Sequence, residues 1–392
     1  MARPPLEVAD VFRVHGADYL RSAKGAVSSA KRRVLAALEA CRTAKLGGHV
    51  QECEDCGHRR ISYNSCRNRH CPKCQGQARA DWLDARRADL LPVEYFHVVF
   101  TVPEEIAAIA LQNKKELYGI LMRASAATLK EIAADPKRLG AEIGFVSVLH
   151  TWGQNLLHHP HVHCVVPGGG LAPDGSRWVS CRPGFFLPVK VLGKMFRGKF
   201  LHAVDRAFRA GQLRFQGPLR HLQEAPALRA YLAACRRKDW VVYSKPPFGG
   251  PEQVLKYLAR YTHRVAISNA RLLRMADGNV TFSWKDYAGG HRQRTMTLAA
   301  AEFIRRFLLH VLPKGFPRIR HYGLLGNRSS ALRRCRELLA CAPPDPAPDN
   351  PTSAAPEAEG RRCPVCGSAA LRHREATAED LLLLAPTRLD SS

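Results

Sequence analysis

The chain has 392 residues, 13 cysteines and a formal net charge of +26, from 60 Lys and Arg against 34 Asp and Glu. This length provides for two or three domains, and the charge favours a polyanionic partner, most simply nucleic acid, over a ribosomal-type or merely basic protein. The sequence has no N-terminal apolar segment and no apolar run of about 20 residues, so we expect no membrane partner and a cytoplasmic, nucleoid-associated location.

Residues 1–92 are expected to form a small helical, zinc-binding and DNA-binding domain. Apolar residues recur at helical spacing within residues 6–45. Two Cys-x-x-Cys pairs follow, and in a reducing compartment such pairs are more typical of zinc ligands than of disulfides. Because two pairs complete a tetrahedron with no open position, the sequence predicts a structural zinc site. Its predicted ligands are Cys53, Cys56, Cys71 and Cys74.

Two further residues between these pairs are alternative zinc ligands. Cys66 and His70 would each replace a member of the quartet or hold a second ion. The surrounding residues are basic, and we expect Arg67, Arg69 and Lys73 to contact DNA phosphates.

Residues 93–330 are expected to form the main domain. Residues 95–102 resemble a buried strand, a helix opens at Pro103 and runs towards Ala134, and residues 142–150 form a second strand. A third strand is predicted to begin after Pro160, because proline suits the first residue of a strand but not its interior.

The second half of this domain is predicted to contain basic helices in residues 191–238 and a short strand at 239–243. Three antiparallel strands are then expected at 265–267, 280–284 and 292–298, with turns at Asp277-Gly278 and Gly289-Gly290.

The predicted third strand carries His161-Val162-His163. Side chains alternate along a strand, so His161 and His163 share one face while Val162 points into the core. Two neighbouring histidines supply most of a metal site. By itself a His-x-His pattern is more often incidental.

A helix starting at Pro251 carries Tyr257 and Tyr261 at i and i+4, on one face. Such a pair usually packs in a core. With metal-binding histidines, however, a tyrosine can cut a phosphodiester and store the bond energy as a phosphotyrosine ester. The sequence has no phosphate-binding Gly-x-x-x-x-Gly-Lys loop, which agrees with chemistry that needs no ATP. His263 is a candidate base for the tyrosine proton.

Residues 331–392 are expected to form a linker and tail. Prolines crowd residues 342–361, and one more pair, Cys363 and Cys366, follows. Alone this pair is half a zinc site, with Cys335 and Cys341, His373 or a second chain as candidate partners. Before the linker, Arg318 and Arg320 lie in a basic stretch that forms either a solvated face or a DNA track.

Five stretches carry a family resemblance. They are Tyr63-Asn-Ser-Cys-Arg-Asn-Arg-His-Cys-Pro-Lys-Cys74, Leu149-His-Thr-Trp-Gly-Gln-Asn155, His159-Pro-His-Val-His163, Tyr257-Leu-Ala-Arg-Tyr-Thr-His-Arg264 and Arg320-His-Tyr-Gly-Leu-Leu-Gly-Asn-Arg328. In order and spacing they resemble the two-tyrosine HUH rolling-circle transposases of the insertion sequence 91 kind.

The resemblance implies an α+β fold, in which an HUH nuclease core (an antiparallel sheet backed by helices) follows a small zinc-binding helical domain. It also implies catalysis by Tyr257 and Tyr261, with His161 and His163 holding Mg²⁺ or Mn²⁺ and structural Zn²⁺ on the cysteines. The third ligand of the catalytic metal is open among His159, Gln154 and His150, of which His159 and Gln154 rank first together.

The implied partners are the single-stranded ends of a mobile element and its target DNA, with host helicase or replication proteins as further candidates. Arg260 and Arg264 are expected to contact the DNA. Two alternatives remain: a replication initiator or relaxase with the same chemistry, and a non-catalytic zinc-dependent DNA-binding protein.

Overall fold

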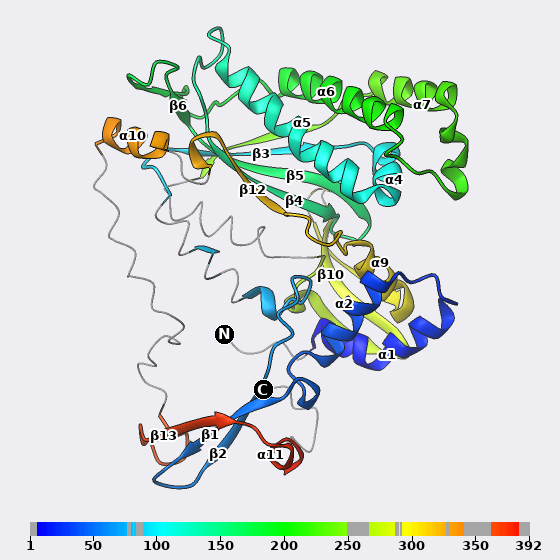
Figure 1. Ribbon diagram of the computed structural model, residues 1–392, viewed down its shortest axis with the longest axis vertical. Coiled ribbons are helices and arrows are strands. Elements are labelled where there is room, and N and C mark those ends of the chain that lie inside the picture. The colour runs from blue at the N-terminus through cyan, green and yellow to red at the C-terminus, as the bar shows by residue number, and fades with distance from the viewer. Residues whose placement is uncertain are drawn as a thin grey trace. The chain divides into compact units, whose positions relative to one another are not determined.

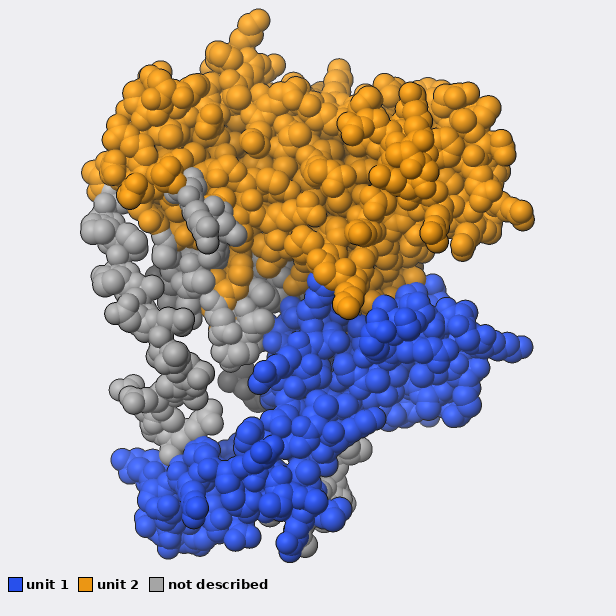
Figure 2. All heavy atoms as spheres, in the orientation of Figure 1, with its two compact units in different colours: residues 1–77, 268–305, 346–392 blue, residues 78–267, 306–345 orange. Residues whose placement is uncertain are grey.

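The computed structural model describes residues 6–76, 80, 82–83, 89–248, 266–286, 290, 292–326, 330–340 and 362–383. The chain divides into two compact units, coloured separately in Figure 2. Unit 1 comprises residues 1–77, 268–305 and 346–392, and unit 2 comprises residues 78–267 and 306–345. Each unit joins segments that are distant in sequence, so the unit boundaries do not coincide with the three consecutive ranges that the sequence predicts. Within the described residues, no helix combines the length and apolarity needed to cross a membrane.

Unit 2 is built on a five-stranded sheet in which every neighbouring pair is antiparallel. The strands, in spatial order, are β12 (Ile319–Tyr322), β4 (Phe145–Trp152), β5 (His158–Pro167), β3 (Tyr95–Thr101) and β8 (Val242–Phe248). Because side chains alternate along a strand, the sheet has two distinct faces. Phe100, Leu149 and Val162 lie side by side on one face and are fully buried.

Four helices cover that apolar face (Figure 1). They are α4 (Glu104–Gln112), α5 (Lys114–Ala134), α6 (Val189–Arg209) and α7 (Ala225–Arg237). The expected helix after Pro103 is divided at Asn113, whose side-chain amide donates to the carbonyls of Ile109 and Arg214. The α+β fold class, an antiparallel sheet backed by helices, is confirmed.

Two strand predictions were wrong in position. Pro160 lies inside β5 and not before it, at a place where the β4–β5 register shifts. An irregular ladder tolerates a residue without an N–H donor, which the prediction did not allow for. Likewise, residues 266–268 form no strand, and the first strand of the three-stranded sheet is β9 (Leu272–Ala276), directly before the turn at Asp277.

Unit 1 contains two three-stranded antiparallel sheets and the N-terminal helices. Its elements are α1 (Val8–Ser22), α2 (Ser29–Ala40), β1 (Gly48–Cys53), β2 (Arg59–Tyr63), β9, β10 (Asn279–Asp286), β11 (Arg292–Ala299), β13 (Leu371–Glu375) and α11 (Ala378–Leu383). Helix α9 (Ala300–Leu309) follows β11, and its Phe303 packs edge-on against Phe282 of β10. Strand β13, from near the C-terminus, lies beside β1 from near the N-terminus (Figure 1).

The remaining described elements are short. They are β6 (Gly169–Leu171), β7 (Trp178–Ser180), α10 (Ser330–Leu338) and the 3₁₀ helices Ala44–Leu46, Gly217–Gln223, Asn269–Arg271 and Gly323–Leu325.

Candidate functional site

Three histidines meet on the face of the five-stranded sheet that the helices do not cover. His150 of β4 and His161 of β5 are directly opposite one another in the ladder, and His163 is two residues further along β5. One ring nitrogen from each lies within 4.8 Å of the others. His150 and His163 are almost fully buried. The arrangement supplies three imidazole ligands from two adjacent strands.

A hydrogen bond decides the tautomer of His161, and a second hydrogen bond orients the ring of His163. The Nδ1 of His161 lies 2.6 Å from the carbonyl oxygen of His159. A carbonyl only accepts, so Nδ1 donates and the lone pair is on Nε2. The Nδ1 of His163 is 2.7 Å from the Nε2 of His97, on β3, and the two rings stack. A proton on the Nδ1 of His163 would place its lone pair on Nε2 in the same way.

Burial keeps these rings neutral. Desolvation lowers the pKa of His161 to about 3 and holds the pKa of His163 well below its usual range. The neutral imidazole is the form that binds a metal ion.

The turn between β4 and β5 fixes the register that brings His150 to His161. A buried imidazole, that of His310, donates from Nε2 to the carbonyl of Leu156 at 3.0 Å, and the Thr151 hydroxyl is 3.2 Å from its Nδ1. Arg306 donates to the carbonyl of Asn155 at 3.0 Å. These contacts hold the turn from a segment far along the chain.

The third histidine of the cluster is therefore His150, whereas His159, which the sequence analysis ranked above it as third ligand, is not a member. The ring of His159 is next to that of His161, at 5.3 Å between centroids, but it is exposed and outside the cluster. The register between β4 and β5 decides which residue of β4 faces His161. This register cannot be read from the sequence. Gln154 lies in the turn and stays a prediction.

The tyrosines and two of the basic residues lie outside the residues that the structure describes. These are Tyr257, Tyr261, Arg260 and Arg264, together with the candidate base His263. Their roles stay predictions.

The cysteines form two clusters in unit 1, and the predicted quartet was wrong in its grouping. Cys71 and Cys74 meet Cys41 and Cys66, with a separation of 3.6 Å between the Cys41 and Cys74 sulfurs. Cys66, predicted as an alternative ligand, is thus a member of this cluster. Cys41, at the end of α2, was missed, since it belongs to no Cys-x-x-Cys pair.

The other predicted pair, Cys53 and Cys56, meets the C-terminal pair Cys363 and Cys366. His70 joins neither cluster, and its Nδ1 is 3.0 Å from the side-chain oxygen of Asn68. Among the residues that the structure describes, two four-cysteine clusters therefore replace the single quartet.

Comparison with known proteins identifies the chain. A family of transposase zinc-binding domains, of the insertion sequence 91 kind, matches residues 11–102, and a second family described as "Putative transposase" matches residues 144–332. The "Putative transposase y4qJ" of Sinorhizobium fredii is 60% identical over 375 residues, which cover 93% of this chain and 94% of that protein. The chain belongs to the two-tyrosine transposase family of the insertion sequence 91 kind.

Two more distant similarities accompany these matches. The transposase for insertion sequence element IS801 of Pseudomonas savastanoi pv. phaseolicola is 29% identical over 318 residues, or 79% of this transposase and 74% of that protein. A conjugative relaxase, TrwC, solved with OriT DNA in a metal-free form, is 16% identical with a TM-score of 0.22, over 43% of this transposase and 71% of that chain. A structural likeness this low says nothing about the chemistry of the transposase.

The basic residues predicted to contact DNA differ in their surroundings. Lys73 of the transposase pairs with buried Glu7 at 2.7 Å, so its charge is matched inside unit 1. Arg67 is exposed, and Arg69 is partly buried, which lowers its pKa. Arg320, on β12, lies over the ring of Phe316. A phosphate contact stays a prediction for each of these residues, of which Arg67 is the exposed one.

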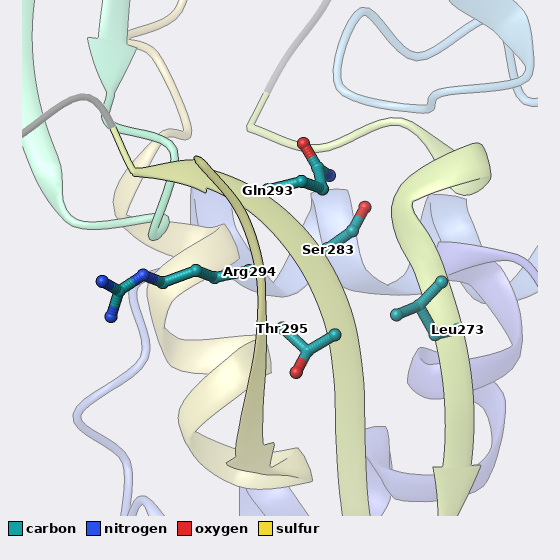
Figure 3. Close-up of a pocket in the computed structure, with 5 residues that line it drawn as sticks. All are labelled: Leu273, Ser283, Gln293, Arg294 and Thr295. Atoms are coloured by element: carbon teal, nitrogen blue, oxygen red, sulfur yellow. The ribbon is translucent and has the colours of Figure 1, made fainter. Parts of the chain in front are cut away.

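An open hollow of about 590 Å³ lies on the β9–β11 sheet of the transposase (Figure 3). Its lining is Leu273, Ser283, Gln293, Arg294 and Thr295. Arg294 is paired with Asp286 at 3.1 Å. The lining contains no residue of the histidine or cysteine clusters.

His97 is a residue that sequence reasoning missed, because it lies within an apolar run. We expect His97→Ala to weaken Mn²⁺ binding by about 10–100-fold, since it removes the partner that orients a ligand imidazole. Isothermal titration with Mn²⁺ checks this. His158→Phe is the matched control, since His158 bonds the hydroxyl of Tyr118 on α5 and is not a member of the histidine cluster. Equal Mn²⁺ affinity for His97→Ala and wild type would contradict a positioning role.

Proposed function

We propose that this transposase nicks and rejoins single-stranded DNA through a 5′-phosphotyrosine intermediate and so moves an insertion sequence by a rolling-circle type of mechanism. The observation that carries the proposal is the cluster of His150, His161 and His163, in which one ring nitrogen of each histidine lies within 4.8 Å of the others. Membership of the transposase family agrees with it.

The donor set fits a divalent ion. Three neutral imidazoles would hold it. This set of nitrogen ligands would bind Mn²⁺ more tightly than Mg²⁺, which prefers oxygen ligands. When bound, such an ion neutralises charge on the oxygens of the scissile phosphate. His97 and the carbonyl of His159 then keep the ligand rings in the tautomer that binds metal.

The proposed nucleophiles are the phenol oxygens of Tyr257 and Tyr261. In each cut an oxygen–phosphorus bond forms to the tyrosine, the bond from phosphorus to the 3′ oxygen breaks, and the leaving oxygen takes up a proton. The phenol proton passes to a base, for which His263 is the candidate. Because the ester retains the bond energy, attack by a new 3′ hydroxyl rejoins the DNA without ATP.

The cysteines and the charge supply the remaining parts of the proposal. Cys41, Cys66, Cys71 and Cys74 would hold a structural zinc ion within the family's zinc-binding domain. The net charge of +26 favours DNA, both element ends and target, as partner. Host helicase or replication proteins would supply the single strand, and the site of action would be the cytoplasmic nucleoid.

A covalent-adduct assay tests the proposal. The full chain is incubated with labelled single-stranded DNA from the element ends, with Mn²⁺, Mg²⁺ or a chelator, and resolved on a denaturing gel. We expect labelled protein with either ion, more with Mn²⁺, and none with the chelator. DNA binding without an adduct on any end sequence, from protein with its zinc bound, would favour a non-catalytic DNA-binding protein instead.

A further inference from the structure

The pair Cys363 and Cys366, near the C-terminus, meets a cysteine pair from the N-terminal part of the chain. The sulfurs of Cys53 and Cys366 are 3.5 Å apart, as are those of Cys56 and Cys363. All four sulfurs lie within 4.8 Å of one another. A tetrahedral zinc site with Zn–S bonds of about 2.3 Å requires sulfur separations of about 3.8 Å, whereas a disulfide requires about 2.05 Å. The spacing is that of four thiolates around one ion.

The two pairs also share one backbone conformation. The N–H of Gly57 donates to the carbonyl of Cys53, and the N–H of Gly367 donates to that of Cys363, both at 2.9 Å. Both glycines have positive φ, 68° and 76°, a region in which a side chain is strained. In addition, the N–H of Cys53 donates to the carbonyl of His58, and that of Cys363 to the carbonyl of Ser368. Each pair is therefore a formed knuckle with its two sulfurs presented together.

Each knuckle leads into a strand beside β1. After Cys56 the chain enters β2, and after Cys366 it enters β13, so that the sheet order is β13-β1-β2. The β13 ladder runs from His49 opposite Glu375 to Cys53 opposite Leu371. Backbone bonds extend it at both ends, since Glu54 donates to Ala370 and Ala376 donates to the carbonyl of Gly48.

The segment after β13 is also fixed. Arg374 forms an ion pair with the carboxylate of Asp380, which accepts from the N–H of Thr377 at the start of α11. Thus residues 362–383 form an ordered piece of unit 1 and not an isolated tail.

We propose that Cys53, Cys56, Cys363 and Cys366 bind a second structural Zn²⁺, which joins the C-terminal segment to the N-terminal zinc-binding module. The site is distinct from the Cys41 cluster, and two of its ligands lie beyond the residues 11–102 that match the family's zinc-binding domain. Its four thiols lose their protons on binding, and with no open position the ion is structural. The proposal is independent of the nicking chemistry.

Zinc counting on the full chain tests the proposal. Protein purified under reducing conditions and dialysed against a weak chelator is expected to hold two zinc ions per chain. The double variant Cys363→Ser/Cys366→Ser should hold one, and so should Cys53→Ser/Cys56→Ser. Combining these four substitutions should still leave one ion, because both pairs serve the same site. Adding Cys71→Ser/Cys74→Ser should remove the last ion.

Two further variants separate a ligand role from a packing role. Cys335→Ser changes a buried cysteine outside both clusters and should leave two ions. Cys366→His should regain the second ion that Cys366→Ser loses, since zinc accepts three thiolates and one imidazole. One ion in the wild type, two ions in Cys363→Ser/Cys366→Ser, or no ion in the four-substitution variant would each overturn the proposal.

Discussion

Replacing both Tyr257 and Tyr261 with phenylalanine is expected to abolish the covalent protein–DNA adduct. Each substitution removes one phenolic oxygen and keeps the ring, so the double variant lacks both proposed nucleophiles while its packing changes little. The His150, His161 and His163 cluster is untouched, and metal binding should be as in wild type. Adduct formation on labelled single-stranded end DNA, followed on a denaturing gel, measures the loss.

The single variants show which of the two tyrosines makes the first cut. If Tyr257 and Tyr261 act in succession, one single variant loses the first cut and the other makes it but fails to complete strand transfer. DNA binding, measured by fluorescence anisotropy, should stay near the wild-type value in all three variants. An undiminished adduct in the double variant would move the nucleophile to another residue and remove the basis of the proposed chemistry.

Elements with strong local patterns were predicted well. The apolar run at 95–102 became β3, and the stretch from Glu104 to Ala134 became two helices with a short break. The strand predicted at 265–267 was misplaced. The sequence analysis chose an apolar triplet there over Leu272–Ala276, although Leu272–Ala276 adjoins the turn at Asp277. Strand propensity depends on what a residue packs against, which a single sequence does not show.

The residue types of the metal sites could be predicted from the sequence, but which of these residues meet in space could not. Alternation along a strand places the two imidazoles of the His-x-His pair on one face, but identifying the third member of the cluster requires the β4–β5 register. Contacts from Arg306 and His310 help to hold that register, and these residues are more than 140 positions away in sequence. The cysteine pairs were likewise visible, whereas their partners come from opposite parts of the chain. A signal was available, since Cys41, Cys66 and three Cys-x-x-Cys pairs together make two sets of four.

His150→Ala is expected to reduce adduct formation at least about 100-fold, whereas His159→Ala should leave it close to wild type. Removing one of three metal ligands forfeits part of a charge stabilisation worth several kcal/mol, and each 1.36 kcal/mol is a factor of ten in rate. His150 faces His161 across the ladder, while His159 is exposed and contributes its backbone carbonyl. That carbonyl remains in His159→Ala. Initial rates at a series of Mn²⁺ concentrations, and Mn²⁺ affinity by calorimetry, give the two readouts.

Because His150 is buried, a fold defect must be separated from a ligand defect. The zinc content and the cooperativity of thermal unfolding of His150→Ala, and of His158→Phe as a β5 histidine outside the cluster, should both match the wild type. A ligand defect lowers Mn²⁺ affinity in His150→Ala alone, and raised Mn²⁺ partly restores its rate. The reverse pattern, with His159→Ala inactive and His150→Ala active, would return the third position to His159.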